Sequence, residues 1–306
     1  MKIMRAHAFG GPDILVLDEV EAPAPGAGQI LVRTKAIGVN PVDWKLLSGT
    51  APVLPPLPLV PGGDIAGIVD AVGAGVESVK AGDPVIAHPG LTGCYAEARV
   101  MDAAHAAPLP EGFSFAEGAS LPLVGLTAWQ GLRADGRDLA GLTVLIHNAA
   151  GGVGTVAVQM VKARGGRVVA TASPANTDFV RALGADEVVD FRTAPVEGRS
   201  QDIDILLDLV GNSKETGLWS LVRSGGSVIR IAGGADAAAF EELKGVRAYK
   251  VRVRPSGAQL GEIAALASQG LIRAEIALQL PFARAAEALA ASKGGHVRGK
   301  IVLTVD

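Results

Sequence analysis

The sequence has few features that would cross-link the chain or bias its charge. Cys94 is its only cysteine, which excludes an intramolecular disulfide and a zinc site built from several thiolates. The 28 Lys and Arg residues nearly balance the 31 Asp and Glu residues, for a formal net charge of −3. Because nucleic acid is bound mainly through an excess of basic side chains, we expect no nucleic-acid partner.

Apolar segments that would enter a membrane are also scarce. The first residues contain no apolar run of signal-peptide length. The segment 139–161 contains no Asp, Glu, Lys or Arg over 23 residues, which is long enough to span a bilayer. The polar and glycine-rich stretch 148–154 interrupts it, and this pattern favours a buried strand, a turn and a helix. We therefore expect no membrane partner and a cytoplasmic protein.

Glycine, in contrast, is abundant. It supplies 40 of the 306 residues, about 13 % against a usual ~7 %. Without any repeat period, this content indicates many tight turns and close backbone approaches. At roughly 150 residues per domain, the length suggests two domains.

The second half of the chain alternates strand and helix patterns. Apolar, β-branched runs predict strands at 143–147, 167–172, 187–191, 204–210 and 227–232. Helical patterns between them cover 155–164, 178–183 and 215–222. Strands separated by helices indicate right-handed βαβ units and a parallel sheet covered on both faces. The segment 249–254 alternates at period two before Pro255 and predicts an edge strand.

The first hundred residues follow a different pattern. Short strands at 30–36 and 65–72 have no long helix between them, which indicates a mainly antiparallel unit. The tail returns to strands at 276–280 and 300–305 around a helix at 283–291. The Pro-rich stretch 51–61 is a loop, either a surface linker or a segment that lines a site. We predict an α/β chain, with a β-rich domain at 1–115 and 257–306 and a doubly wound parallel-sheet domain at 116–256.

The glycine turn after the strand 143–147 is the most informative motif. Aligned with the dinucleotide-binding fingerprint, it has Ala149 at the first glycine position, followed by Gly151 and Gly154. Gly151 and Gly152 let the backbone approach a pyrophosphate, and Gly154 lets the helix pack against the strand. Its place between a strand and a helix supports a cofactor site; the alternative is a purely structural turn. The predicted cofactor-binding residues of this turn are Ala150, Gly151, Gly152, Val153 and Gly154.

The end of the second strand favours NADPH over NADH. An NAD site expects an acidic residue there to bind the ribose 2′-hydroxyl, but none occurs before Asp178. The small hydroxyl of Ser173 instead leaves room for a 2′-phosphate.

Several short motifs, taken together in chain order, resemble the medium-chain dehydrogenase/reductase superfamily, and within it the zinc-independent quinone oxidoreductases. The resemblance covers essentially the whole chain. The motifs are Gly-Val-Asn-Pro-Val-Asp-Trp at 38–44, Val-Pro-Gly-Gly-Asp-Ile-Ala-Gly at 60–67, Lys-Ala-Gly-Asp-Pro-Val at 80–85, Leu-Thr-Ala-Trp at 126–129, Ala-Gly-Gly-Val-Gly at 150–154, Leu-Gly-Ala-Asp at 183–186 and Gly-Lys-Ile-Val-Leu at 299–303.

The resemblance also shows what this chain lacks. Zinc alcohol dehydrogenases of the superfamily carry Cys where this chain has Asn40, and Gly-His-Glu where it has Gly-Gly-Asp at 62–64. Their structural-zinc cysteine quartet is absent too, and the five histidines show no paired ligand spacing. We therefore predict no metal. Without a Lewis acid to polarise an alcohol or a carbonyl, hydride transfer to an already electron-poor acceptor becomes the expected chemistry.

The resemblance implies a GroES-like catalytic domain, a Rossmann domain, and an NADPH hydride delivered in the cleft between them to a quinone or to the β-carbon of an α,β-unsaturated carbonyl. It places Asn40 beside the nicotinamide, although Asn40 also suits the cap of a turn. Lys300 is expected to reach the cofactor or stabilise an enolate; the alternative is a solvated surface lysine. Asp43 and Asp64 are expected to fix loops, and water to protonate the product.

The resemblance further assigns cofactor contacts. Thr127, at the start of a helix, is expected to hydrogen-bond the cofactor, unless it is a structural residue inside that helix. Val210–Gly211 ends the fourth strand, where the family passes the nicotinamide ribose, and the glycines at 233–234 end the fifth strand; both also suit ordinary turns. Family members often carry a basic residue where this chain has Asn176 and Thr177, and several carry Tyr at the position of Phe191. The full set of predicted cofactor residues is Asn40, Thr127, Ala150, Gly151, Gly152, Val153, Gly154, Ser173, Asn176, Arg192, Val210, Gly211 and Gly233.

Two other functions stay open at this point. A dedicated biosynthetic enoyl reductase would share the cofactor site, and a non-catalytic sensor would bind NADPH without passing on a hydride. The expected edge strand at 249–254 would pair with its copy across a two-fold axis, so we also expect a homodimer.

Overall fold

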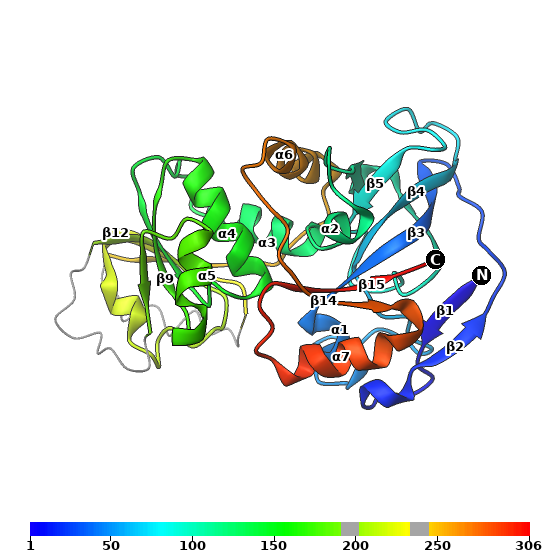
Figure 1. The fold of residues 1–306 in the computed structure, drawn as a ribbon, viewed down its shortest axis with the longest axis horizontal. Helices are drawn as coiled ribbons and strands as arrows, with labels where there is room; N and C mark the ends of the chain where they lie inside the picture. Colours follow the sequence, from blue (N-terminus) through cyan, green and yellow to red (C-terminus); the bar gives the residue numbers. More distant parts are fainter. Residues whose placement is uncertain (191–201, 233–244) are drawn as a thin grey trace. The chain divides into compact units, whose positions relative to one another are not determined.

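The computed structural model describes residues 1–190, 202–232 and 245–306 (Figure 1). Two compact units divide the chain: Met1–Leu126 with Arg254–Asp306, and Thr127–Val253. The limits expected from the sequence, 115/116 and 256/257, stay a prediction of domain boundaries. No helix within the described ranges is long and apolar enough to cross a membrane.

The first unit is built on a seven-stranded sheet. Its order is β14-β15-β3-β4-β5-β7, with β6 paired to β3, and all ladders except β14 with β15 are antiparallel. The strands are β3 (Gln29–Val39), β4 (Asp64–Val72), β5 (Pro84–Ala87), β6 (Ala98–Asp102), β7 (Ala106–Pro108), β14 (Ile276–Pro281) and β15 (Lys300–Thr304). A separate antiparallel pair joins β1 (Lys2–Arg5) and β2 (Val16–Glu19). The expected antiparallel front and the two tail strands are confirmed.

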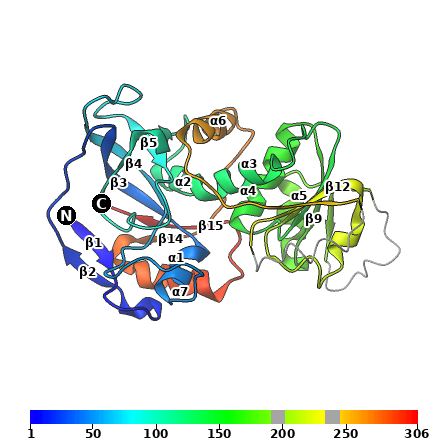
Figure 2. The same ribbon diagram turned by 180° about the vertical axis from the view of Figure 1, so that it is seen from behind.

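Helices flank this sheet, and the views of Figures 1 and 2 show α7 following β14 along the chain. The helices of the unit are η1 (Pro12–Ile14), α1 (Pro41–Leu47), η2 (Ala103–His105), α2 (Phe115–Ala119), α6 (Gly257–Ser268), η6 (Phe282–Arg284) and α7 (Ala285–Gly294), while α3 (Pro122–Leu132) crosses the division between the units. The sequence analysis did not predict α6. Its buried residues Leu260, Ile263, Ala264 and Ala267 follow the helical i, i+3, i+4, i+7 spacing.

The second unit contains the predicted parallel sheet. Its order is β10-β9-β8-β11-β12-β13, and every ladder is parallel. The strands are β8 (Thr143–His147), β9 (Arg167–Thr171), β10 (Glu187–Val189), β11 (Ile203–Asp208), β12 (Val222–Arg230) and β13 (Arg247–Lys250). The helices are α4 (Gly152–Ala163), η3 (Pro174–Asn176), α5 (Thr177–Ala182) and η4 (Leu218–Leu221). Every residue of the central strand β11 is buried, including Asp204 and Asp208. Its apolar residues 205–207 are consecutive rather than alternating, as expected for a strand covered on both faces.

Two expectations about this unit were wrong in part. The helix expected at 215–222 is only the short η4, because Gly217 before it adopts a left-handed conformation at φ 71° and Val222 already begins β12. The edge strand expected at 249–254 is at the edge of the sheet, but it runs over Arg247–Lys250. Phe191, the end of the expected strand 187–191, lies outside the described residues.

Candidate active site and cofactor site

Three strand ends of the first unit meet at one place. In the antiparallel ladder of β3 and β15, Ile301 pairs with Val39, so the preceding Lys300 lies beside Asn40. In the ladder of β3 and β4, Gly38 pairs with Asp64. A side chain at Gly38 would meet the carbonyl oxygen of Ala119 and would come within 2.9 Å of Asp64 Cβ, so a glycine is needed there. The register of the sheet thus brings together three polar residues that are distant in sequence.

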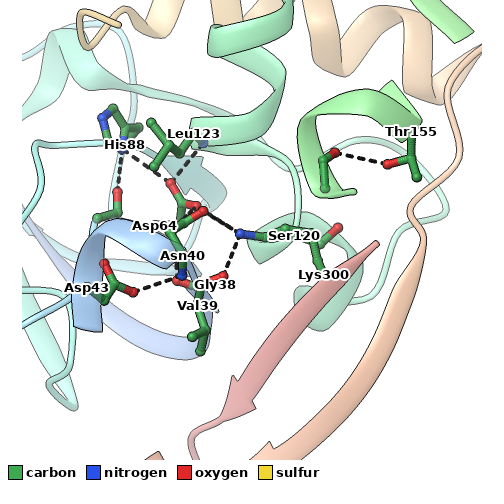
Figure 3. Close-up of polar contacts among 12 residues, drawn as sticks. Gly38, Val39, Asn40, Asp43, Asp64, His88, Ser120, Leu123, Thr155 and Lys300 are labelled. Carbon is green, nitrogen blue, oxygen red and sulfur yellow. Dashed lines mark hydrogen bonds and ion pairs between the residues drawn. The ribbon is translucent and has the colours of Figure 1, made fainter. Parts of the chain in front are cut away.

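Asn40 links the other two members of this cluster (Figure 3). Its Nδ2 donates a hydrogen bond to Asp64 Oδ2 at 2.8 Å, and its Oδ1 accepts one from Lys300 Nζ at 2.6 Å. Asn40 is also the N-cap residue of α1, and its backbone N–H donates to Asp43 Oδ2 at 2.9 Å. Asn40 therefore stands at the start of the helix and also joins the cluster, and its side chain uses both a donor and an acceptor, which an amide provides.

Lys300 is a buried residue, with 5 % of its surface exposed, rather than a solvated surface lysine. Its Nζ donates to the carbonyl oxygen of Val39 at 2.8 Å and lies 3.7 Å from Asp64 Oδ2. Burial lowers the pKa of Lys300, against the opposing effect of the carboxylates of Asp64 and Asp43. The structure therefore holds an amine at a fixed position, with an anion beside it.

Asp64 extends the cluster to a buried histidine. Its fully buried carboxylate accepts the backbone N–H of Leu123 at 2.8 Å through Oδ1, which also lies 3.2 Å from His88 Nδ1. His88 Nδ1 is 2.6 Å from the carbonyl oxygen of Gly63, and two acceptors around one nitrogen require that this nitrogen carries a proton. Burial lowers the pKa of His88, but the hydrogen bond and charge of Asp64 outweigh it and raise the pKa overall. The result is a continuous series of hydrogen bonds from His88 through Asp64 and Asn40 to Lys300.

His88 was not predicted from the sequence as a site residue, and Asp64 was expected only to fix a loop. One signal for Asp64 was available: a carboxylate stands at the first position of a buried strand, immediately after Gly62 and Gly63. Burying a charge there is costly unless it is paired. His88 follows β5 and gives no comparable signal.

Asp43 carries a second buried carboxyl group, which contacts Asn40 of the cluster. Its Oδ2 accepts the N–H of Asn40 and the hydroxyl proton of Tyr95 at 3.2 Å. Its Oδ1 is buried and has no hydrogen-bond partner in the described part of the chain. Burial raises the pKa of Asp43 to about 7, so this carboxyl is close to half protonated near neutral pH.

The described residues contain no group of three or more His, Cys, Asp or Glu side chains placed to hold a metal ion. The prediction that the chain works without a metal stays a prediction.

In the second unit, the glycine turn joins β8 to α4. Asn148 adopts a left-handed conformation at φ 69°, and Gly151 is the N-cap of α4 without any side-chain cap. A Cβ at Gly154 would meet the carbonyl oxygen of Asn148 and would lie 2.6 Å from Ala149 Cα. The helix therefore starts directly against the end of the strand, as the motif predicts. The first N–H groups of α4 have no partner within the helix, so they fit an anionic pyrophosphate.

After β9, the strand next to β8 in the sheet, Ser173 is the N-cap of the short helix η3 and Asn176 is its last residue. Ser173 is half-buried, and its hydroxyl makes no hydrogen bond to the described residues, so it fits a role in binding an added group. Arg167 begins β9 and forms an ion pair with Glu187 at 3.1 Å, at the other end of the strand. Arg192 and Gly233, two further predicted cofactor residues, lie outside the described residues.

The turn Val210–Gly211 follows β11, and a buried carboxylate fixes it. Asp208 Oδ1 accepts the N–H groups of Val210 at 3.1 Å and Gly211 at 2.7 Å, while Oδ2 accepts that of Ser213 at 3.1 Å. The turn leaves 42 % of Val210 exposed. Asp208 was not singled out in the sequence, and it gives this turn a fixed shape at the carboxyl edge of the sheet, where ligands of parallel sheets bind.

Thr127 was expected at the start of a helix, and this was wrong. It lies inside α3, five positions after Pro122, with 4 % of its surface exposed. The helix begins earlier because Pro122 suits a first helical turn. A contact between Thr127 and the cofactor therefore stays a prediction.

Comparison with known proteins matches two family models. Residues 26–111 match the alcohol dehydrogenase GroES-like domain, and residues 183–303 match the family described as zinc-binding dehydrogenase. A quinone oxidoreductase of Rattus norvegicus is 36 % identical over 237 residues, covering 75 % of this chain and 72 % of the relative. An NADPH-dependent alkenal/one oxidoreductase of Arabidopsis thaliana chloroplasts is 31 % identical over 317 aligned residues, covering 99 % of this chain and 79 % of the relative.

Solved structures agree with this match over the whole chain. The quinone oxidoreductase of Coxiella burnetii superposes with a TM-score of 0.91 at 31 % identity, covering 100 % of this chain and 99 % of the other. The Escherichia coli quinone oxidoreductase, in complex with NADPH, superposes with a TM-score of 0.87 at 27 % identity, covering 100 % of both chains. The antiparallel unit and the parallel-sheet unit described above are thus the two parts of a known architecture.

Proposed function

Since the chain belongs to the quinone oxidoreductase-like members of the medium-chain dehydrogenase/reductase superfamily, we propose that it is an NADPH-dependent reductase that works without zinc. Its acceptors are quinones or the β-carbon of α,β-unsaturated carbonyl compounds. A nicotinamide cofactor and oxidoreductase activity follow from the family; NADPH, the absence of zinc and the class of acceptor are the proposal.

The observation that carries the proposal is the buried cluster of Asn40, Asp64 and Lys300. The Asn40 amide and the Lys300 ammonium group hydrogen-bond each other at 2.6 Å where the ends of β3, β4 and β15 meet. The ammonium charge stabilises the negative charge that develops on the acceptor oxygen when a hydride arrives. This suits a quinone or an enone, because both place that charge on oxygen.

In this scheme, bound NADPH supplies the hydride, and the chain supplies position and charge. Lys300 is held by Asn40 and the carbonyl oxygen of Val39. Asp64 and His88 hold the far side of Asn40 and balance the charge of Lys300. One proton from water completes the reduction: a quinone becomes a hydroquinone after taking up a hydride and a proton, and an enone becomes the saturated ketone.

Most cofactor residues of the proposal belong to the turns after β8, β9 and β11, at the carboxyl edge of the parallel sheet. Ala150 and Gly151 to Gly154 take the pyrophosphate, and Ser173 with Asn176 take the 2′-phosphate; Val210 and Gly211 face the nicotinamide ribose. Asn40, Thr127, Arg192 and Gly233 complete the set, of which Arg192 and Gly233 lie outside the described residues. The Arabidopsis thaliana alkenal/one oxidoreductase is NADPH-dependent and the Escherichia coli quinone oxidoreductase binds NADPH, which supports this cofactor. A solved structure of 30 % identity is an NAD-dependent alcohol dehydrogenase, so NADH is tested beside NADPH.

The test is the consumption of NADPH and NADH with a panel of quinones and enones, with and without a metal chelator. We expect fast, chelator-insensitive oxidation of NADPH, and the best acceptor identifies the substrate class. Lys300→Met should lower kcat about a hundredfold while the chain stays folded. Lys80→Met is the matched control, because the Lys80 side chain is 84 % exposed. NADPH binding without acceptor-dependent oxidation would overturn the proposal and favour a sensor or a dedicated substrate.

We further propose that the chain forms a homodimer through β13. This strand ends the sheet, and Arg247, Ala248 and Lys250 on it are exposed. An exposed edge strand pairs readily with a second copy. Sedimentation at micromolar concentration should give a dimer mass, and a monomer mass would contradict this arrangement.

A further inference from the structure

A cavity of about 380 Å³ lies in the second unit, away from the glycine turn. Its lining is Arg133, Gly136, Arg137, Asp138, Leu139 and Arg164. Residues 133–142 lead into the first residue of β8, and Arg164 is the C-cap of α4, whose other end begins at the glycine turn. The cavity therefore lies at the amino edge of the parallel sheet, whereas the dinucleotide fingerprint lies at the carboxyl edge.

Two of its arginines share one aromatic ring. The Cζ atoms of Arg133 and Arg164 lie 3.8 Å and 5.2 Å from the centre of the Trp129 ring, and Trp129 is 4 % exposed. Stacking uses the face of a guanidinium group and leaves the N–H groups on its edge available. Neither Arg133 nor Arg164 forms an ion pair or a side-chain hydrogen bond within the described ranges. Both are exposed at the cavity with their donors unused.

The third arginine plays a different part. Arg137 donates through Nε to Asp135 Oδ2 at 2.7 Å and through Nη2 to the carbonyl oxygen of Asp204 at 2.8 Å. Burial raises the pKa of Asp135, but the hydrogen bonds and charge of Arg137 outweigh it and lower the pKa overall. The ion pair of Arg137 with Asp135 is held in place by these hydrogen bonds and carries almost no net charge. Among the lining residues, Asp138 is the one acidic residue. Arg133 and Arg164 each add a positive charge that has no ion-pair partner within the described ranges.

The position of the arginines at two helix ends does not by itself explain this arrangement. Arg133 follows α3 and Arg164 follows α4, and cations are favoured near the C-termini of helices. A cation near a helix C-terminus is favoured in whichever direction its side chain points from the last turn. Here both guanidinium groups are instead fixed on one ring and border one cavity.

We propose that this cavity is a binding site for a small organic anion with at least two negative charges, carried by phosphate or carboxylate groups. Each guanidinium fork is matched to a pair of anionic oxygens, so two forks select a dianion over a monoanion. The volume is that of a small-molecule site. The site is separate from the one that carries the proposed function, so each is tested independently.

The experiment is a titration of the full chain, saturated with NADPH so that the dinucleotide site is filled. Inorganic pyrophosphate, phosphate and citrate are added at physiological ionic strength, and binding is followed by calorimetry and tryptophan fluorescence. We expect saturable binding of pyrophosphate or citrate, tighter than that of phosphate; the better of the two distinguishes a phosphorylated from a carboxylate ligand. Absence of saturable binding would overturn the proposal.

The variants make the assignment specific. Replacing both Arg133 and Arg164 by Gln should weaken binding at least tenfold and leave NADPH binding and quinone reduction unchanged. Arg181→Gln is the matched control, because Arg181 is an exposed arginine on α5 outside the cavity, and it should bind the anion as the wild type does. If the double variant does not fold, Arg164→Lys keeps the charge and loses the fork, and it should also bind more weakly. Equal affinity in the wild type and these variants, or equal loss in Arg181→Gln, would disprove the site.

Discussion

The amide of Asn40 accepts a hydrogen bond from Lys300 at 2.6 Å and donates one to Asp64 at 2.8 Å, so that one neutral side chain joins a buried cation to a buried anion. Neither a carboxylate nor an apolar side chain of the same size does both. The identity of this residue therefore sets the charge balance of the site, and it replaces the cysteine of the zinc enzymes in the family.

Asn40→Asp tests this arrangement directly. The new carboxylate faces Asp64 across the distance now spanned by a hydrogen bond, and two buried carboxylates in contact repel each other. We expect about 3 kcal/mol lower free energy of unfolding near pH 8 and at least tenfold lower kcat. The loss should shrink near pH 5, because a shared proton relieves the repulsion. Urea unfolding and quinone reduction at both pH values measure this, and a pH-independent loss would contradict it.

Gly154→Ala tests the close approach of α4 to β8. The added methyl group would lie 2.6 Å from Ala149 Cα, and the backbone atoms of Asn148 and Ala149 leave it no room. We expect the helix start to shift, with a loss of about 1–3 kcal/mol in stability and at least tenfold weaker NADPH binding. Gly261→Ala is the control: Gly261 lies inside α6 with nothing within 4 Å of the added methyl group, so alanine should stabilise the chain by up to about 1 kcal/mol. Equal thermal unfolding of both variants would contradict the packing argument.

Ser173→Asp tests the choice of cofactor. A carboxylate at the end of β9 repels a 2′-phosphate and accepts a hydrogen bond from a ribose 2′-hydroxyl. We expect weaker NADPH binding, with NADH binding spared or improved. Fluorescence titration with both cofactors gives the ratio of dissociation constants, and Ser173→Ala separates the added charge from the lost hydroxyl. Unchanged NADPH affinity in Ser173→Asp would remove Ser173 from the phosphate site.

The parallel sheet was predictable because its strands are buried on both faces. β8 and β11 each contain three consecutive apolar residues, 144–146 and 205–207, and the predicted strand at 143–147 has the observed limits. One residue prevents the helix expected at 215–222. Gly217 has a left-handed conformation, so a helical turn begins only after it. A single glycine of this kind cannot be distinguished in the sequence from one that a helix tolerates.

Asn40 and Lys300 were predictable as members of the site, but the contact between them was not. The family motifs pointed to Asn40 and Lys300 separately. Their contact depends on the pairing of Ile301 with Val39, two residues at opposite ends of the chain. The hydrophobic periodicity of a single strand carries no information about which residue it pairs with. His88 was missed for the same reason, since only the neighbouring strands β4 and β5 bring it to Asp64.

Asp43 makes stability depend on pH in a defined direction. Its pKa is raised from 3.8 to about 7 by burial, so between these values the folded chain keeps a proton that the unfolded chain has lost. Stability from this residue is therefore highest below about pH 4, falls as the pH rises to about 7, and is level above. At 1.36 kcal/mol per unit, the fall is of the order of 4 kcal/mol. Asp43→Asn cannot titrate, so the free energy of unfolding of the wild type minus that of the variant should fall over this range. Urea unfolding of both proteins at several pH values between about 4 and 8 measures the difference, and a constant or rising difference would show that Asp43 is ionised in the folded chain throughout.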